Sequence, residues 1–512
     1  LVASTGGPHP RCLTAGTASP SARNPMYLRR RVAGGAACCV GCAFGRWPSQ
    51  PAAQEKAGSA TDAVQPVKGG GRAEAADCIV VGGGIVGAMV ARDLARRGAE
   101  VVLLERSSCG SEASGLSAGT LWSAGMPRLV TERDAATYLR AGSSELLRSL
   151  GEACEYNRCG ALELAVTPED VCWLRQDCEA GKRKGLAVEW VEGVDLIMLE
   201  PALAGGSALA AIHTPLSGSV QPALATRAIA DQAESAGSRV IEGEEALSID
   251  RSQDGSAWVV CTSGGQRFAA AHVVLAAGAW SAPLAATAGV RLPVVPVKGV
   301  ICTSPAPPST LRKVIYECSS RRHFTEVGDG RNDLLATPAK CTHGQDGTHR
   351  LVRKLYAKQC GPSDEHQLVF GGDRIPGVRD DDYSVPEETE RAVWAHATEL
   401  FPAAIYDLVR GTLRAASDEA GAWAGLMPFS ADGKPIVGEL APLGLPNLWM
   451  ACGFGPSGVM EGPMAASLLA ARLAARLGFA GDGDGVGLGG DEEQRAVMRA
   501  IDPCREGCCA RC

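Results

Sequence analysis

The sequence lacks several features that would place the protein in other classes. No stretch approaches the ~18 uninterrupted apolar residues that a membrane-spanning helix needs. Basic residues are not in excess, because 50 Lys and Arg stand against 57 Asp and Glu and give a net charge of −7. This balance argues against a nucleic-acid partner. Internal repeats, metal-ligand spacing and a Ser-His-Asp arrangement are also missing. The 512 residues are enough for two domains with a large core.

Acidic residues are missing from the first part of the chain. Residues 1–54 contain six arginines and no Asp or Glu. This composition is typical of an organelle transit segment and predicts a mitochondrial or plastid location. Two alternatives stay open, namely a secretory signal starting near Met26 and a disordered extension. Residues 55–75 have the composition of a linker, so residues 1–75 are expected to be dispensable for folding.

Cysteine is abundant, but the twenty cysteines do not form the spaced framework of a short secreted protein. We expect most of them to be reduced thiols. Cys504, Cys508, Cys509 and Cys512 gather in the last nine residues, where binding of a soft metal is an alternative. Residues 481–490 are glycine-rich, so we interpret residues 481–512 as a flexible linker and a Cys-rich tail.

One segment carries the clearest functional pattern. Residues 77–87 read Asp-Cys-Ile-Val-Val-Gly-Gly-Gly-Ile-Val-Gly and precede a helix-like stretch. Gly82 allows a sharp turn, Gly84 lets a pyrophosphate approach the backbone, and Gly87 lets the helix pack close to the sheet. The helix N-terminus favours phosphates. Glu105 ends the next predicted strand, where its carboxylate can accept the ribose hydroxyls. The pattern predicts a dinucleotide site.

The chain beyond this motif alternates strand and helix patterns. Pro168 follows Thr167, which predicts a helix N-terminus with Thr167 as its cap. A glycine turn at 264–265 predicts an antiparallel pair. Met464 to Ala480 has the pattern of an amphipathic surface helix, and residues 325–367 have the composition of an insertion. Strands are predicted at 161–166, 239–241, 258–261, 267–268 and 272–276, and a helix at 223–236.

Later segments resemble the flavoprotein family of D-amino-acid oxidases, glycine oxidases and sarcosine oxidases, from about Asp77 to Leu477. The matching segments are 112–119, 218–222, 272–281, 423–438 and 453–458. The resemblance implies FAD as the cofactor, with no metal. It also implies an α/β fold in which a Rossmann-like FAD domain (about 77–150, 218–290 and 420–480) accompanies an α+β substrate domain with an antiparallel sheet (about 151–217 and 291–419).

The motifs and the resemblance together give a set of expected FAD contacts. These are Gly82, Gly84, Ile85, Val86, Gly87, Glu105, Arg106, Ser114, Ala118, Gly119, Ala277, Gly278, Trp280, Gly453, Gly455, Ser457, Gly458 and Val459. Small residues let the main chain lie against a flat ring system, which is why glycine and alanine dominate this set.

The resemblance fails where relatives place cations for the substrate carboxylate. Met427, Met460 and Leu116 occupy these positions. Lys298, Arg322 and Arg374 are therefore the candidate cations, and small substrates such as glycine or D-alanine are expected to be poor. A bulkier or less charged amine is the expected alternative.

The resemblance implies an enzyme that dehydrogenates a C–N bond of an amino acid or a secondary amine by hydride transfer to flavin. Oxygen or a quinone-type molecule is the expected electron acceptor. His323 and Tyr316 are candidates for handling the amine proton. One alternative is a flavin-bound, non-catalytic organelle assembly factor, and another is an oxidoreductase that uses NAD at the first motif.

Overall fold

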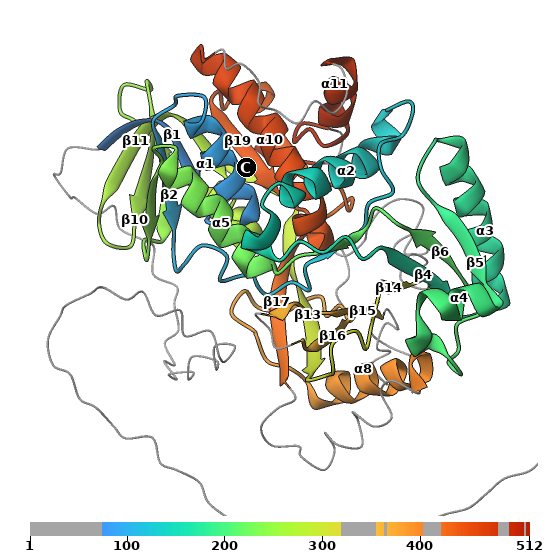
Figure 1. Cartoon of the computed structure of the whole chain (residues 1–512). Helices are drawn as coiled ribbons and strands as arrows, with labels where there is room; N and C mark the ends of the chain where they lie inside the picture. Colours follow the sequence, from blue (N-terminus) through green and yellow to red (C-terminus); the bar gives the residue numbers. More distant parts are fainter. Residues whose placement is uncertain are drawn as a thin grey trace, which may run out of the picture. The chain divides into compact units, whose positions relative to one another are not determined.

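The computed structural model describes residues 74–318, 355–362, 366–402, 421–479, 491–505 and 508–511. All of them belong to one compact unit that spans residues 61–512. Two eight-stranded sheets form its framework, and helices cover them (Figure 1). The expected α/β fold with a Rossmann-like part is confirmed. No helix in the described ranges is long and apolar enough to cross a membrane.

The first sheet contains the dinucleotide motif. Its order is β18-β19-β11-β1-β2-β8, and the pairs from β19 to β8 are parallel. The central strands are almost fully buried, as their runs of valine, isoleucine and leucine require. The antiparallel pair predicted around the 264–265 turn is confirmed as β10 and β11, and β9 pairs with the other edge of β10. The strands are β1 Glu74–Val81, β2 Val101–Glu105, β8 Arg239–Glu242, β9 Ala246–Arg251, β10 Trp258–Thr262, β11 Arg267–Leu275, β18 Ile436–Glu439 and β19 Leu448–Cys452.

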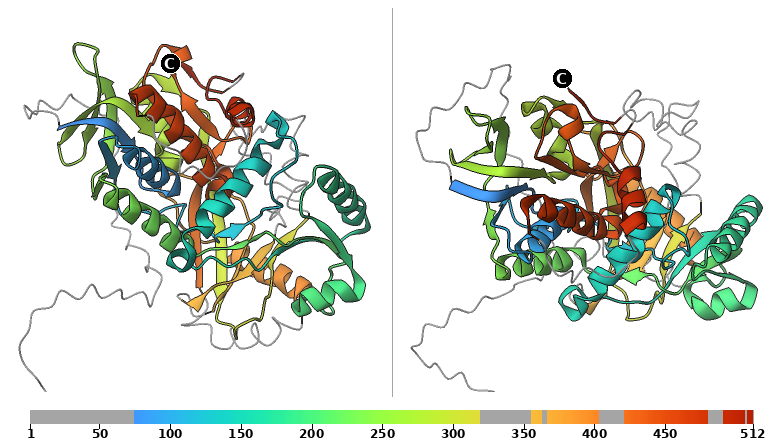
Figure 2. Two further views of the ribbon diagram at one scale, coloured as in Figure 1. Left: turned by 45° about the horizontal axis from the view of Figure 1, so that its top comes forward. Right: turned by 90° about the horizontal axis from the view of Figure 1, so that it is seen from above.

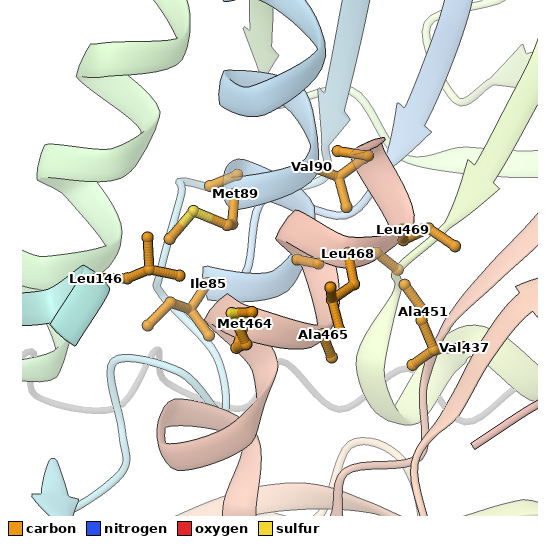
Figure 3. Close-up of a cluster of buried hydrophobic side chains, with 14 of the residues drawn as sticks. Ile85, Met89, Val90, Leu146, Val437, Ala451, Met464, Ala465, Leu468 and Leu469 are labelled. Carbon is orange, nitrogen blue, oxygen red and sulfur yellow. The ribbon is translucent and has the colours of Figure 1, made fainter. Parts of the chain in front are cut away.

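A layer of helices packs on this sheet. α10 (Gly458–Leu477) lies between α1 (Ile85–Ala95) and α2 (Ala135–Arg148), and α5 (Pro222–Ser235) flanks α1. Figure 3 shows Met464, Ala465 and Leu468 of α10 against Ile85 and Met89 of α1. The helix predicted from Met464 to Ala480 is present, but only its last turns form an amphipathic surface helix, because the first two-thirds of α10 are buried between neighbouring helices.

The second sheet follows the order β17-β13-β16-β15-β14-β4-β6-β5. It is antiparallel apart from the parallel pair of β14 and β4. Helix α8 (Glu387–Leu400) covers β13 and β16, while α3 (Pro168–Arg183) and α4 (Gly193–Leu199) lie at the β5 end (Figure 2). The strands are β4 Ala161–Ala165, β5 Glu189–Glu192, β6 Ala210–Thr214, β13 Val294–Ser304, β14 Val314–Glu317, β15 Tyr356–Gln359, β16 Leu368–Gly371 and β17 Gly421–Ser430.

Thr167 caps α3 as predicted, since its side chain accepts the Asp170 N–H at 3.1 Å and Pro168 is the first helical residue. Other short elements connect the two sheets and their helices. They are α6 Ser281–Thr287, β3 Thr120–Leu121, β7 Gly218–Ser219 and β12 Val290–Arg291.

Two sequence-based boundaries differ from the structure. β17 was expected in the FAD domain, yet it pairs with β13 along ten residues and belongs to the second sheet. β15 lies inside the expected insertion at 325–367, yet it is an inner strand of the second sheet. Polar composition hides β15 because its two buried central residues are Ala357 and a lysine, Lys358, which carry no strong apolar strand signal. The remaining residues of that segment mostly lie outside the described part.

The C-terminal segment also differs from its prediction as a flexible tail. Residues 491–500 form helix α11, which contacts α2, and β20 (Ala510–Arg511) pairs with β12. Three apolar side chains of this segment are buried in the core beside the first sheet, namely Val497, Met498 and Ile501. The glycine-rich stretch 481–490 lies outside the described residues. The linker-like composition of residues 481–490 therefore did not indicate whether the residues that follow are folded.

Candidate functional site

A cavity of about 630 Å³ runs from the glycine turn after β1 to the face of the second sheet. Its walls come from both sheets and from the loops at 106–119, 276–284 and 451–460. All but two of the expected FAD contacts line it, the exceptions being Gly87 and Gly453. The lining members are Gly82, Gly84, Ile85, Val86, Glu105, Arg106, Ser114, Ala118, Gly119, Ala277, Gly278, Trp280, Gly455, Ser457, Gly458 and Val459.

The turn between β1 and α1 has the geometry that the glycines predicted. Gly82 adopts a φ of +108°, in the region that favours glycine. Gly87 lies outside the cavity, and a Cβ there would collide with the carbonyl oxygen of Gly82, so its role is close packing. The first helical N–H, that of Ile85, donates to Ser114 Oγ at 3.0 Å. The N-terminus of α1 therefore opens into the cavity beside the 112–119 loop.

Glu105 ends β2 with its carboxylate at the cavity wall. Its Oε2 accepts the Gly83 N–H at 2.6 Å, and Oε1 accepts the Ser107 N–H at 2.9 Å. Burial raises the pKa of this carboxyl, and the two backbone donors partly offset that effect. The backbone thus fixes the carboxylate next to the glycine turn, in the position where a dinucleotide places its ribose.

Arg106 and Trp280 form one wall at this end. The Arg106 guanidinium stacks over the Trp280 ring, 3.6 Å from its centroid. Arg106 also pairs with Glu112, whose other oxygen accepts the Tyr383 hydroxyl at 2.6 Å. These contacts tie the 112–119 loop to the loop that precedes α8.

Backbone and several small residues line the middle of the cavity. Trp423 Nε1 donates to Leu116 O at 2.9 Å and fastens the 112–119 loop to β17. A Cβ on Gly425 would lie 3.2 Å from Leu116 Cβ, so glycine allows this close approach. Gly455 and Gly458 face the same space from the turn before α10. The residues fit FAD, since backbone and small side chains line the cavity where its ring system would lie.

One register row of the second sheet forms the far end of the cavity. Gly371, Tyr356, Tyr316 and Glu163 are direct neighbours on β16, β15, β14 and β4. Direct neighbours point to one face of a sheet, and the last three line the cavity. Burial raises the pKa of both tyrosines, so both hydroxyls stay protonated at neutral pH.

Arg374 follows β16 and lines the same end. Its Nη1 donates to the Asp373 carbonyl oxygen at 2.8 Å, and its buried Nε has no hydrogen-bond partner in the described part of the chain. A Cβ on Gly299 would lie 2.7 Å from Met427 Cε and 3.7 Å from Arg374 Nη1. The guanidinium therefore lies near Met427, one of the positions at which the resemblance led us to expect a cation.

Lys298 does not line this cavity, which corrects its prediction as a substrate-binding residue. Its Nζ lies 2.9 Å from Asp382 Oδ2 and 3.1 Å from Ser384 Oγ, and the side chain is 3% exposed. The sequence could not show this ion pair, because the two residues are 84 positions apart. His323 and Arg322 lie outside the described residues.

Sequence reasoning missed two charged groups at the far end. Arg140 on α2 lines the cavity and is paired with buried Glu461, with nitrogen–oxygen distances of 2.8 and 2.9 Å. Glu163 lines it from β4 and is buried. A carboxylate in the middle of the buried strand 161–165 was the one available signal, since such a residue is rarely buried without a role.

The fold and the cavity define a flavin-dependent oxidoreductase. A family model described as FAD dependent oxidoreductase, DAO, matches residues 77–472, so the chain belongs to that family. FAD is its cofactor, and the expected class of enzyme is confirmed. The alternative of a non-catalytic assembly factor finds no support in these relatives.

Three similarities illustrate the family. Glycine oxidase of Geobacillus kaustophilus (strain HTA426) is 27% identical over 399 residues, which are 77% of this chain and 92% of the relative. The crystal structure of glycine oxidase from Geobacillus kaustophilus superimposes with a TM-score of 0.62 over 79% of this chain and 95% of that one, at 27% identity. The 4-methylaminobutanoate oxidase (formaldehyde-forming) of Paenarthrobacter nicotinovorans is 32% identical over 216 residues, 42% of this chain and 26% of the relative.

Proposed function

We propose that the protein oxidises the C–N bond of an amino acid or of a carboxylate-bearing secondary amine, and that Arg374 binds the substrate carboxylate. The observation that carries this proposal is the buried Arg374 Nε, which has no hydrogen-bond partner among the described residues and lies at the end of the cavity near Met427. Relatives whose names include glycine oxidase and 4-methylaminobutanoate oxidase support the substrate class.

The electrostatics of Arg374 favour an anionic ligand. No described carboxylate forms an ion pair with Arg374, although Asp373 and Tyr356 lie near enough to interact with its charge. Burial lowers the pKa of the guanidinium, but arginine remains protonated at neutral pH. A buried cation with an unused donor is costly unless an anion pairs with it. A substrate carboxylate would supply both the charge and the acceptor.

The remaining residues orient the substrate and exclude water. FAD, when bound, supplies the hydride acceptor. Tyr316 and Tyr356 lie side by side in the register row that ends at Glu163, and both are neutral hydroxyls able to donate to the substrate. Their burial shields the reacting carbon from water, and desolvation lowers the pKa of an amine bound there. The imine product then reacts with water.

The electron acceptor is proposed to be oxygen or a quinone-type molecule. In the first case hydrogen peroxide accumulates in proportion to the imine, and in the second a quinone accelerates flavin reoxidation. Import into a mitochondrion or plastid is likewise a proposal, supported by the arginine-rich composition of residues 1–54.

An anaerobic screen tests the substrate class. The yellow protein is mixed with amino acids, N-alkyl amino acids, simple amines and 2-hydroxy acids, and the flavin absorbance is followed. We expect at least one carboxylate-bearing amine to bleach the flavin absorbance and the matching 2-hydroxy acid to leave it unchanged. Bleaching by hydroxy acids alone would contradict the proposed C–N chemistry.

A further inference from the structure

The C-terminal segment is held firmly against the first sheet. The Val437 N–H of β18 donates to Ile501 O at 2.8 Å, and β20 pairs with β12. Arg505 anchors the segment in between, because its Nε and Nη2 reach the two carboxylate oxygens of Asp432 at 2.7 and 2.9 Å. Asp432 lies in the turn that joins β17 to β18. The segment therefore has a defined place that the flavin chemistry of the cavity does not explain.

Two adjacent thiols lie in this segment. The Sγ atoms of Cys508 and Cys509 are 3.8 Å apart, within contact distance for sulfur. Both residues are partly exposed and pack against the core of the first sheet. Most described cysteines in strands and helices are buried instead, such as Cys78 and Cys302. The pair is thus partly accessible to small molecules, and its two sulfur atoms are already in contact.

The surroundings distinguish the two thiols from each other. Hydrogen bonding from the Cys509 thiol lowers the pKa of Cys508, and the nearby Arg505 charge acts in the same direction. The same contact and burial raise the pKa of Cys509. Cys508 is therefore the more acidic thiol of the pair and the better placed to act as the nucleophile.

We propose that Cys508 and Cys509 form a redox-active dithiol that peroxides convert reversibly into a vicinal disulfide. The Cys508 sulfur attacks a peroxide oxygen, the O–O bond breaks, and a sulfenic acid and water form. The Cys509 sulfur then attacks the Cys508 sulfur, the S–O bond breaks, and a second water leaves. Two thiols and one hydrogen peroxide give one disulfide and two waters, so the balance is complete.

Geometry makes such a disulfide easy to reduce again. Neighbouring Cα atoms lie about 3.8 Å apart across a trans peptide, shorter than the usual separation in disulfides. The bond is therefore strained, which is typical of labile rather than structural disulfides. Closing the ring must also move the backbone, which two hydrogen bonds now hold in place. The Cys508 N–H donates to Arg505 O and the Cys509 N–H donates to Pro503 O, each at 3.1 Å. We expect oxidation to loosen the β20–β12 pair.

The decisive experiment treats the FAD-loaded full chain with a small excess of hydrogen peroxide, blocks free thiols, and maps the C-terminal peptide without reduction. The expected result is a peptide lighter by two hydrogens, restored by a dithiol reductant. In Cys509→Ser a sulfenic acid on Cys508 should persist and react with dimedone. In Cys508→Ser neither product should form. Cys172→Ser, which removes an exposed cysteine on α3, serves as the matched control and should behave as wild type.

Phenylarsine oxide gives an independent test, because trivalent arsenic bridges two thiols that lie this close. Wild type should retain one arsenical per chain after dilution, and both Cys508→Ser and Cys509→Ser should lose it while keeping their FAD. A disulfide to Cys504 instead, or unchanged arsenical retention in both variants, would overturn the proposal.

Discussion

Lys298 Nζ lies 2.9 Å from Asp382 Oδ2, which makes a lysine that resembles a substrate-binding residue part of a structural ion pair. We predict that Lys298→Met destabilises the protein by about 1–2 kcal/mol, since Asp382 loses a charged partner but keeps its bonds to Ser384 and to solvent. The midpoint of urea unfolding should fall, while the KM for the substrate should stay within a factor of two or so. A large rise in KM with unchanged stability would instead show that Lys298 binds the substrate.

Glu105 is predicted to contribute to FAD binding. Glu105→Ala removes the carboxylate beside the glycine turn together with its bonds to Gly83 and Ser107. FAD affinity should weaken by about 1–3 kcal/mol, the range for a lost charge-assisted hydrogen bond. Titration of the apoprotein with FAD measures this directly, and Glu100→Ala on the exposed surface is the control. Equal affinities would remove Glu105 from the cofactor site.

His396 is predicted to give the stability a pH dependence. Burial opposes its charge, but hydrogen bonds to Glu317 at 2.6 Å and to Glu399 at 3.3 Å raise the pKa of His396 overall. A histidine whose pKa is raised by folding stabilises the folded state fully at pH values below its unfolded-state pKa, about 6.5. This stabilisation is lost as the pH rises through its folded-state pKa. Wild type should therefore exceed His396→Gln in melting temperature by more at about pH 6 than at about pH 9. A difference independent of pH would show that the histidine is not charged.

The N-terminal residues are predicted to be dispensable. β1 begins at Glu74, so a chain starting at residue 74 retains the whole first sheet. Its flavin content and melting temperature should match those of the full chain. A marked loss of either would show that the preceding residues contribute to the fold.

The glycine turn and the small-residue loops could be predicted because their constraints are local. The φ of Gly82 and the packing of Gly87 follow from a strand, a turn and a helix that are adjacent in sequence. The substrate end could not be predicted in the same way. Arg374 and Met427 come close only because β13 pairs with both β16 and β17. This order of strands is set by the packing of the whole sheet.

The same reasoning explains the C-terminal error. Val497, Met498 and Ile501 have the spacing of a buried helix face, but the pattern is short and follows a glycine-rich stretch. Its partner surface, on α2 and on the turn at Glu132–Asp134 that precedes α2, lies more than 300 residues earlier in the chain, as the Arg499–Glu132 ion pair illustrates. Local sequence carries no information about such a contact.

Binding of the substrate carboxylate by Arg374 is the central claim, and anaerobic flavin reduction tests it most directly. The measurement compares wild type, Arg374→Lys and Arg374→Met with one carboxylate-bearing amine and with its decarboxylated analogue. Losing a buried charged hydrogen bond is worth about 1.5–3 kcal/mol, which corresponds to roughly 10–150-fold in apparent affinity. We predict that loss for the carboxylate-bearing amine in Arg374→Met, partial rescue in Arg374→Lys, and little change for the analogue. Equal losses for both amines, or none for either, would contradict it.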